Sequence, residues 1–266
     1  MQSFQKIIWD YYNLHRRIMP WREKITPYHV FVSEVMLQQT QVARVMEKFS
    51  PFVKLFPNFK KLAEAPLCDL LLAWQGMGYN RRALYLKKAA ETVVREYRGR
   101  LPQSLDKLEK LAGIGPATAR SIAVFAWNTP VVFIETNVRA VFLHHFFSNR
   151  AGVADSELLP LLAAALDREY PREWYYALMD YGVMLKHAHK NPSRASAHYT
   201  KQSKFEGSLR EIRGKIVKIL SVEKTLFTAF ALTRRVAEPS VKISVALHSL
   251  VRDGLVKKDG RKFSIA

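Results

Sequence analysis

Two glutamates beside apolar residues are the first candidates for chemistry. Glu135 follows the apolar run 130–134 and directly precedes a stretch with helical spacing. A carboxylate at a helix start interacts favourably with the helix dipole, so a purely structural role would explain it. Glu34 lies in an apolar helical stretch, where partial burial would favour its protonated form, although a polar stripe on a surface helix explains it too. One protonated and one ionised carboxylate would suit a general acid and an electrostatic partner.

The charge of the chain indicates a polyanionic partner. Its 266 residues include 42 Lys and Arg against 23 Asp and Glu, a formal net charge of +19. Such a surplus favours nucleic acid over an anionic membrane. No apolar run approaches the roughly 20 residues of a membrane span, and the N-terminus has no signal-peptide pattern. We therefore expect an intracellular protein, cytoplasmic and nucleoid-associated if bacterial, that is a monomer without a membrane partner.

Helical periodicity dominates residues 1–185, which we expect to form one all-α domain. Apolar residues recur three and four positions apart, and Gly and Pro punctuate the stretches between them. The predicted helices are 28–50, 61–73, 82–98, 104–111, 117–127, 137–147, 155–168 and 173–186. No strand pattern precedes residue 200.

The rest of the chain divides into a basic segment and a small module. Residues 186–206 hold five Lys or Arg and three His, but the His spacing matches no recognisable metal site, so a solvated surface segment or linker is expected. In 207–266, three predicted helices (209–220, 225–236 and 240–252) precede two short strands within 255–265, joined at Asp259-Gly260. This order is typical of a winged-helix module.

The charge of this module favours DNA binding. Residues 201–266 contain 15 Lys and Arg against 6 Asp and Glu. In winged helices the third helix usually enters a groove and the wing touches the backbone. This predicts backbone contacts from the basic hairpin, at Lys257, Lys258, Arg261 and Lys262. A winged helix that binds protein is the alternative.

A glycine turn between two predicted helices indicates a phosphate site. Gly113 and Gly115 flank Ile114, and Pro116 takes the first position of the next helix, where its missing N–H costs nothing. Glycines let a ligand backbone approach closely, and the free N–H groups at a helix start bind phosphate without reading sequence. We include Thr118 among the predicted contacts. This stretch resembles the helix-hairpin-helix of DNA repair glycosylases.

The resemblance extends over roughly residues 5–185 and is specific. Motifs occur in the order and spacing of the MutY-type A/G-specific adenine DNA glycosylases of the helix-hairpin-helix, endonuclease III-like superfamily. They are MPWR (19–22), VSEVMLQQTQVARV (32–45), WQGMGYNRRA (74–83), LAGIGPATA (111–119), ETNV (135–138) and ALMDYGVML (177–185). The fold implied is mainly α, a helix-hairpin-helix DNA glycosylase fold with the winged-helix-like module after it. That family removes adenine mispaired with guanine or 8-oxoguanine.

The resemblance assigns roles to individual residues. Glu34 matches the catalytic glutamate that protonates the leaving adenine. Glu135 falls on the catalytic aspartate and keeps its charge on a side chain one methylene longer, and Asn137 matches the asparagine two positions on. Gln39 and Thr40 match residues that contact DNA around the opposite base.

Three further residues complete the expected DNA contacts. Tyr79 matches the aromatic residue that wedges into the base stack, although taken alone it could be an ordinary loop aromatic. Met77 is expected to be a filler or a minor wedge. Arg22 stands beside Trp21 and is included as a contact, although it could simply stack or pair.

The chain also departs from the family pattern. Ala117 stands where bifunctional relatives carry a Schiff-base lysine, so base release without strand cleavage is expected. The four cluster cysteines of the family align with Lys186, Ser193, Ser196 and Gln202. Because Cys68 is the only cysteine, no iron–sulfur cluster or other all-cysteine metal site is expected. No other metal or cofactor is expected, since hydrolysis needs none. The larger C-terminal domain of the family, which reads 8-oxoguanine, is replaced by the winged-helix-like module.

Three functions remain open at this stage. The first is a monofunctional DNA glycosylase of base excision repair that acts on duplex DNA holding a mismatched or damaged base, with adenine as the expected base. The second is a glycosylase of the same fold for thymine, uracil or another base. The third is a catalytically silent protein that binds distorted DNA, which the glutamate at position 135 would fit.

Overall fold

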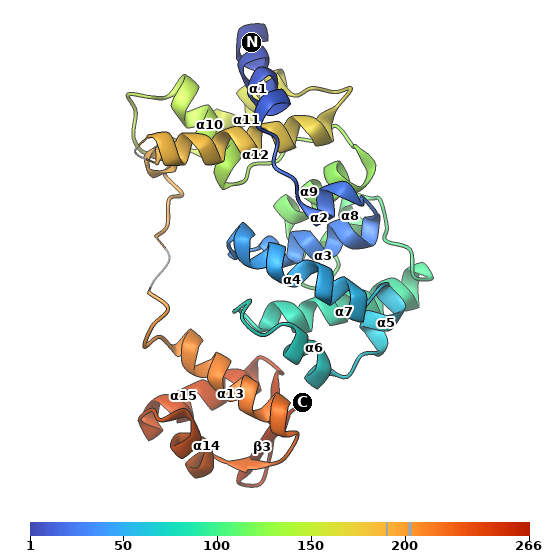
Figure 1. Cartoon of the computed structure of the whole chain (residues 1–266), viewed down its shortest axis with the longest axis vertical. Helices are drawn as coiled ribbons and strands as arrows, with labels where there is room; N and C mark the ends of the chain where they lie inside the picture. Colours follow the sequence, from blue (N-terminus) through green and yellow to red (C-terminus); the bar gives the residue numbers. More distant parts are fainter. Residues whose placement is uncertain (190, 202–203) are drawn as a thin grey trace. The chain divides into compact units, whose positions relative to one another are not determined.

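The computed structural model describes residues 1–189, 191–201 and 204–266 and is mainly helical (Figure 1). The chain forms two compact units. The first unit comprises Met1–Phe31, Gln103–Glu109 and Gly115–Gln202, and the second comprises Val32–Pro102, Lys110–Ile114 and Ser203–Ala266. In the described part of the chain, no helix is long and apolar enough to cross a membrane.

The first unit is built around the helix pair α10 and α12. Its elements are α1 (Gln2–His15), α2 (Pro20–Glu23), α8 (Leu105–Glu109), α9 (Pro116–Trp127), α10 (Thr136–Phe146), α11 (Asp155–Ala165), α12 (Pro171–Ala188) and the 3-10 turn η1 (Pro192–Ala195). Buried residues of α12 follow the helical repeat, as at Trp174, Leu178 and Leu185. Helix α1 also packs on α12, and the ring of Phe4 lies 6.2 Å from that of Trp174. This packing positions the start of α10, which Glu135 directly precedes.

The second unit contains a helical part and a small α/β module. Helix α3 (Pro27–Leu37) begins in the first unit and ends in the second. The other helices of the helical part are α4 (Val42–Leu55), α5 (Phe59–Glu64), α6 (Leu67–Ala73) and α7 (Arg81–Tyr97). Helix α5 packs on α7, with Leu62, Leu86 and Val93 fully buried.

The C-terminal module places three helices beside a three-stranded antiparallel sheet. Its elements are α13 (Leu209–Glu223), β1 (Phe227–Thr228), α14 (Ala229–Val236), α15 (Ser240–Arg252), β2 (Val256–Asp259) and β3 (Lys262–Ile265). The strand order is β1-β3-β2, and Asp259 pairs with Lys262 across the hairpin. The turn residues are therefore Gly260 and Arg261, one position later than predicted. Ile216, Leu247 and Leu255 form part of the module core.

The sequence predicted most helices but not all of their limits. The predicted helix 28–50 is two helices interrupted at 38–41, and 61–73 is interrupted before Pro66, whose ring disfavours helical geometry in the residue before it. Helix α1 was not predicted. Within the apolar run 130–134 only Phe133 is buried, and it stacks on Tyr175 with ring centres 4.1 Å apart.

The compact units divide the chain differently from the predicted domains 1–185, 186–206 and 207–266. The C-terminal module groups with Val32–Pro102 because α13 packs on α6, where the Cys68 thiol donates to the carbonyl oxygen of Ser221 at 3.1 Å. An ion pair between Lys224 and Asp69 adds to this contact. The module is thus docked on the helical part of its own unit.

Candidate active site

Glu135 is the N-cap residue of α10. Its Oε1 accepts hydrogen bonds from the backbone N–H groups of Asn137 and Val138, both at 2.8 Å. Its Oε2 accepts from the side-chain Nδ2 of Asn137 at 3.2 Å. The structural role that the sequence allowed is therefore realised, since the carboxylate accepts from two of the free N–H groups at the helix start. A capping carboxylate remains able to act chemically, because Oε2 has lone-pair capacity beyond its bond to Asn137.

Asn137 is held from a second helix. The Nζ of Lys186, in the last turn of α12, donates to the Oδ1 of Asn137 at 2.8 Å. One turn earlier on α12, Gly182 faces the backbone of Asn137. A Cβ on Gly182 would lie 2.5 Å from the carbonyl oxygen of Asn137, which is closer than real contacts of this kind. The missing side chain at 182 therefore permits the close approach of α10 and α12.

The residues aligned with the family's cluster cysteines do not fit an iron–sulfur cluster. Lys186 binds Asn137, the Oγ of Ser193 donates to the carbonyl oxygen of Thr136 at 3.2 Å, and the Oγ of Ser196 accepts from the N–H of His198 at 3.0 Å. None of the three can supply a thiolate. Gln202 lies outside the described residues. Within the described ranges, no group of three His, Cys, Asp or Glu side chains could hold a metal ion.

Glu34 lies on α3, and the end of this helix is fixed by Arg82. Glu34 is partly exposed. The Arg82 guanidinium is buried and donates to the carbonyl oxygens of Val35 and Met36 at 2.9 and 2.8 Å, and also to the Thr40 hydroxyl at 2.7 Å. Burial lowers the pKa of Arg82 to about 10, so it remains a cation near neutrality. Arg82 thus satisfies helix-end carbonyls next to Glu34.

The same guanidinium shapes the loop that carries Tyr79. Arg82 also donates to the carbonyl oxygens of Met77 and Gly78, at 3.0 and 3.3 Å. Gly78 and Tyr79 both have positive φ, at 66° and 45°. A bulky residue in the left-handed region marks local strain, which often accompanies function. The loop is therefore held in an unusual conformation beside the end of α3.

The C-terminal module meets this loop at Tyr79. Arg210 of α13 donates a hydrogen bond to the Tyr79 hydroxyl, and its guanidinium lies 5.1 Å from the centre of the Tyr79 ring. Asp253, whose side chain is 3% exposed, accepts from Arg81 of α7 and from Arg213 of α13. Burial alone raises the pKa of Asp253, but these hydrogen bonds outweigh it and lower the pKa. Asp253 is therefore ionised, and its ion pairs join the C-terminal module to α7, the helix that follows Tyr79.

The remaining predicted DNA contacts differ in their exposure. Gln39 is exposed and has a φ of 53°, and Thr40 is partly exposed. Met77 is buried at 4% exposure, which suits the filler role rather than the wedge. The Arg22 side chain is 6% exposed, pairs with Asp180 at 2.9 Å and lies over the Tyr176 ring. For Arg22 the structure thus places the guanidinium in the core, in the pairing role that the sequence had left as an alternative to a DNA contact.

The predicted glycine turn precedes α9 and combines a left-handed glycine with an exposed one. Gly113 has a φ of 79°, and a Cβ there would lie 2.9 Å from the Cβ of Tyr85, so only glycine fits. Ile114 is buried, whereas Gly115 is exposed and has open space around its Cα. Gln38 donates from Nε2 to the carbonyl oxygen of Gly113 at 3.2 Å. Thr118 follows in the first turn of α9 and is partly exposed.

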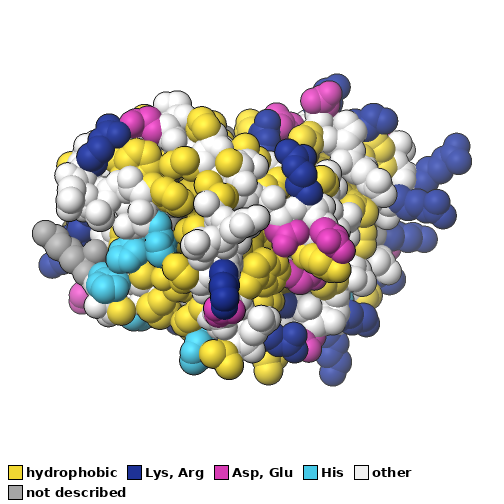
Figure 2. Space-filling view, turned by 90° about the horizontal axis from the view of Figure 1, so that it is seen from above, with side chains coloured by type: hydrophobic (Ala, Val, Ile, Leu, Met, Phe, Trp, Pro, Cys, Tyr) yellow, Lys and Arg dark blue, Asp and Glu magenta, His cyan; other side chains and the backbone are white. Residues whose placement is uncertain are grey.

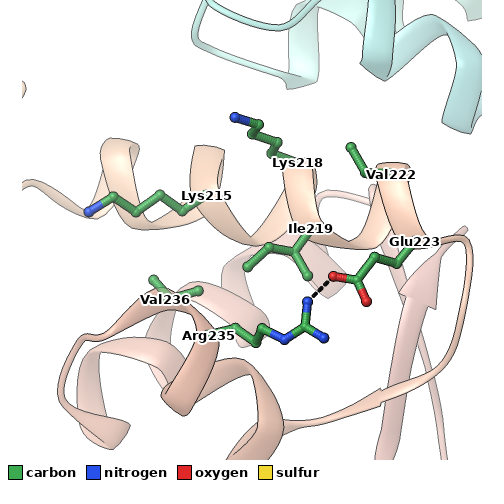
Figure 3. A pocket seen from close by; sticks show the side chains of 7 residues that line it. All are labelled: Lys215, Lys218, Ile219, Val222, Glu223, Arg235 and Val236. Atoms are coloured by element: carbon green, nitrogen blue, oxygen red, sulfur yellow. Dashed lines mark hydrogen bonds and ion pairs between the residues drawn. The ribbon is translucent and has the colours of Figure 1, made fainter.

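Basic side chains of the module project from the β2–β3 hairpin. Lys257, Lys258 and Arg261 are exposed, as is Lys262. A separate groove lies between α13 and α14 and contains none of the predicted catalytic residues (Figure 3). It is lined by Lys215, Lys218, Ile219, Val222, Glu223, Arg235 and Val236, and Arg235 pairs with Glu223 there.

Sequence reasoning missed a histidine group in the first unit. Histidine side chains gather on the face seen in Figure 2. The rings of His144 and His189 lie 5.0 Å apart, and the Nε2 of His145 lies 3.2 Å from the Tyr181 hydroxyl. Burial, and next the neighbouring histidine, lower the pKa of both His144 and His145. Adjacent histidines in the last turn of a predicted helix were the available signal.

Arg82, Gly182, Lys186, Arg210 and Asp253 were also missed as parts of the site. Gly182 lies inside a recognised motif, and Lys186 was considered only as a replaced cysteine. Arg82 follows the Gly-Tyr-Asn loop closely, and its place on the same helical face as the apolar Leu86 and Val93 was a usable signal. Arg210 and Asp253 carried no local pattern, because Arg210 contacts Tyr79, 131 residues away, and Asp253 pairs with Arg81 and Arg213, 172 and 40 residues away.

Comparisons with known proteins agree with this architecture. Residues 32–159 match the model of the HhH-GPD superfamily base excision DNA repair proteins. The structure is also similar to a thermostable thymine-DNA glycosylase, with a TM-score of 0.61 and 22% identity, over 69% of this chain and 86% of that one. The fold is thus that of the HhH-GPD superfamily, the class to which these similarities point.

Curated relatives narrow the assignment. The adenine DNA glycosylase of Mycobacterium tuberculosis is 30% identical over 94% of this chain and 90% of its own length. The adenine DNA glycosylase of Buchnera aphidicola subsp. Baizongia pistaciae is 32% identical over 68% of this chain, which spans 52% of that protein. The chain belongs to the adenine DNA glycosylase family.

Proposed function

We propose that this chain is a monofunctional DNA glycosylase that releases adenine mispaired with guanine or 8-oxoguanine. Family membership supports this function, since the relatives named above are adenine DNA glycosylases. The observation that carries it is the Glu135 carboxylate, which the first turn of α10 and the Asn137 side chain hold in place. A fixed anion of this kind is what a reaction through a cationic sugar requires.

The chemistry divides between two carboxyl groups. Cleavage of the bond between sugar and base leaves its electron pair on the base, and a proton from Glu34 neutralises the leaving adenine. The sugar becomes oxocarbenium-like, and the ionised Glu135 stabilises this developing charge. Water then adds at C1′ and gives up a proton, which restores the acid. The products are free adenine and an abasic sugar with the strand intact.

The proposed DNA grip uses separate elements for phosphate and for the base stack. The amides at the start of α9, next to Gly115, would take a phosphate, since the first N–H groups of a helix have no acceptor within it. Tyr79 would insert beside the opposite base while Gln39 and Thr40 contact the DNA around it. Extruding a base costs a few kcal/mol, which these contacts and the charge of +19 would offset.

The C-terminal module is proposed to act as a winged helix that binds the DNA backbone. Its three helices, its basic β2–β3 hairpin and the exposed Lys257, Lys258 and Arg261 support this. The contact between Arg210 and Tyr79 would connect this DNA-binding module to the loop that carries Tyr79. A monomer would suffice, because the proposed DNA contacts of the glycosylase part and of the C-terminal module lie on one chain.

No cofactor is proposed for the reaction. Hydrolysis needs only the two carboxyl groups and water, and the residues at the family's cluster positions lack thiolates. Iron analysis of the purified protein tests this part separately. Stoichiometric iron with a visible absorption band would contradict it.

A panel of duplexes tests the proposed function. Adenine opposite 8-oxoguanine or guanine, and thymine or uracil opposite guanine, would be incubated with the protein and scored for free base before and after alkali. We expect free adenine to be released without alkali, and strand breaks to appear only after alkali treatment. Release of thymine or uracil in preference to adenine would reassign the base. Binding without release from any duplex would identify a catalytically silent DNA-binding protein.

A further inference from the structure

Lys186 contacts the Glu135–Asn137 pair through the side chain of Asn137. It belongs to the last turn of α12, whereas Asn137 belongs to the first turn of α10. The Nζ of Lys186 is 2.8 Å from the Oδ1 of Asn137 and is partly buried. Burial lowers the pKa of Lys186, and Arg139 lowers it further, whereas the Glu135 charge opposes both effects. The cation is thus partly desolvated, and its hydrogen bond to Asn137 and the nearby Glu135 charge offset part of the cost.

The bond from Lys186 selects one of the two orientations of the Asn137 amide. An ammonium group can only donate hydrogen bonds, so it must face the amide oxygen. The opposite end of the amide, Nδ2, then faces Oε2 of Glu135, to which it donates at 3.2 Å. A flipped amide would place Nδ2 against Nζ and Oδ1 against a carboxylate oxygen, leaving two unfavourable contacts. Lys186 and Glu135 therefore favour the same orientation of the Asn137 amide, and Lys186 stabilises it from the oxygen side.

We propose that Lys186 is a positioning residue for base excision, acting through Asn137 on Glu135. Lys186 fixes the side-chain amide of Asn137. Its positive charge partly balances the negative charge of the Glu135 carboxylate, which must stabilise the cationic sugar during the reaction. The proposal rests on the proposed function of Glu135. Lys186 itself does not touch substrate in this account, because its amine is engaged with Asn137.

Gly182 supports the same arrangement from the same helix. Its missing Cβ allows the backbone of Asn137 to lie against α12, one helical turn before Lys186. The Ser193 hydroxyl then anchors the carbonyl oxygen of Thr136, next to Asn137. The start of α10 is thus held by α12 and by η1, and Lys186 makes the contact that reaches the catalytic pair.

Single-turnover kinetics on a duplex with adenine opposite 8-oxoguanine test the proposal. Lys186→Met keeps the length of the side chain and removes its charge and donors. We expect the rate of base release to fall by about 10- to 100-fold, the scale for a misoriented catalytic group, while duplex affinity changes little. Lys186→Arg keeps the donors and the charge and should restore part of the rate. Lys54→Met removes an exposed lysine from the last turn of α4 and should leave the rate unchanged.

A double-mutant cycle separates positioning from general destabilisation. In the background of Asn137→Ala, Lys186→Met should slow base release little further, because the residue through which it acts is gone. Equal slowing in both backgrounds would overturn the proposal. So would a loss of duplex affinity with a smaller salt dependence, which would make Lys186 a phosphate contact. A borohydride-trapped adduct with DNA that disappears in Lys186→Met would instead make it a nucleophile.

A readout that is independent of activity keeps the inference separate from the proposed function. The wild type, Lys186→Met, Asn137→Ala and the double variant would be unfolded in urea. If the wild type released no base, the proposed function would fail, yet the Lys186–Asn137 contact would still predict non-additive losses of stability. Additive losses would overturn the contact itself.

Discussion

Gly182→Ala is expected to disturb the catalytic pair through one methyl group. The new Cβ would lie 2.5 Å from the carbonyl oxygen of Asn137, so the two helices must separate by at least about 0.5 Å to reach a tolerable 3.0 Å. The 2.8 Å bond from Lys186 to Asn137 would then lengthen beyond the usual range of hydrogen bonds. Overpacking of this kind costs about 1–3 kcal/mol of stability.

Base release should slow even under conditions in which the Gly182→Ala protein remains folded. A displacement of about 1 Å in a positioned group can cost about 100-fold in rate, so a shift near half that size predicts roughly a 10-fold loss. Urea unfolding and single-turnover base release would measure the two effects. Gly214→Ala is the matched control, since it lies in α13 with nothing within 4 Å of the new Cβ. That change should stabilise the protein by about 0.5–1 kcal/mol. Wild-type stability and rate in Gly182→Ala would refute the reasoning.

Three further perturbations are expected to have distinct effects. Arg82→Met should lower the free energy of unfolding by about 3 kcal/mol or more, because carbonyl oxygens at the end of α3 and in the Tyr79 loop lose their donor. Replacing Lys257, Lys258 and Arg261 by Ala should weaken duplex binding and shrink the salt slope by about 0.9 per lost phosphate contact. Acidification should destabilise the first unit: because the pKa values of His144 and His145 lie below the ordinary 6.5, the unfolded chain binds more protons, and stability falls as the pH drops below 6.5.

Each of these expectations has a clear contrary result. An Arg82→Met protein as stable as the wild type would show that water replaces the guanidinium. An unchanged salt slope in the triple variant would mean that the module faces a protein rather than DNA. A melting temperature that does not change between pH 7 and pH 5 would remove the histidine group as a source of pH dependence, and replacing both histidines with Gln should suppress whatever dependence is found.

The sequence predicted the parts of the site that depend on local chemistry. The glycine turn at 113–115 was predicted because positive φ and close approach require glycine, and Glu135 was predicted at a helix start because apolar spacing resumes directly after it. The split of 28–50 into two helices was missed, because no Gly or Pro marks the break: residues 38–41 are Gln, Gln, Thr and Gln, and the backbone turns at Gln39. The helical pattern alone therefore did not locate the loop at residues 38–41.

Contacts made by distant parts of the chain could not be predicted in the same way. Arg22 stands near Trp21 in sequence, but its partner Asp180 lies 158 residues later. Lys186 acquires its role only because Gly182 lets α12 approach α10 closely. The contact between Arg210 and Tyr79 likewise depends on how α13 packs on the helical part of its unit. Tertiary packing decides these roles, and residue type alone leaves several open.

The most direct test of the account is base release by Glu135→Gln. The amide keeps the size of the side chain and an oxygen that can cap α10, but it removes the negative charge. On a duplex with adenine opposite 8-oxoguanine, single-turnover release should fall by roughly 100- to 1000-fold, equivalent to about 2.7–4 kcal/mol, with duplex affinity near that of the wild type. Glu135→Asp should retain or raise the rate. If Glu135→Gln releases adenine as fast as the wild type, Glu135 is only a helix cap and the proposed mechanism is wrong.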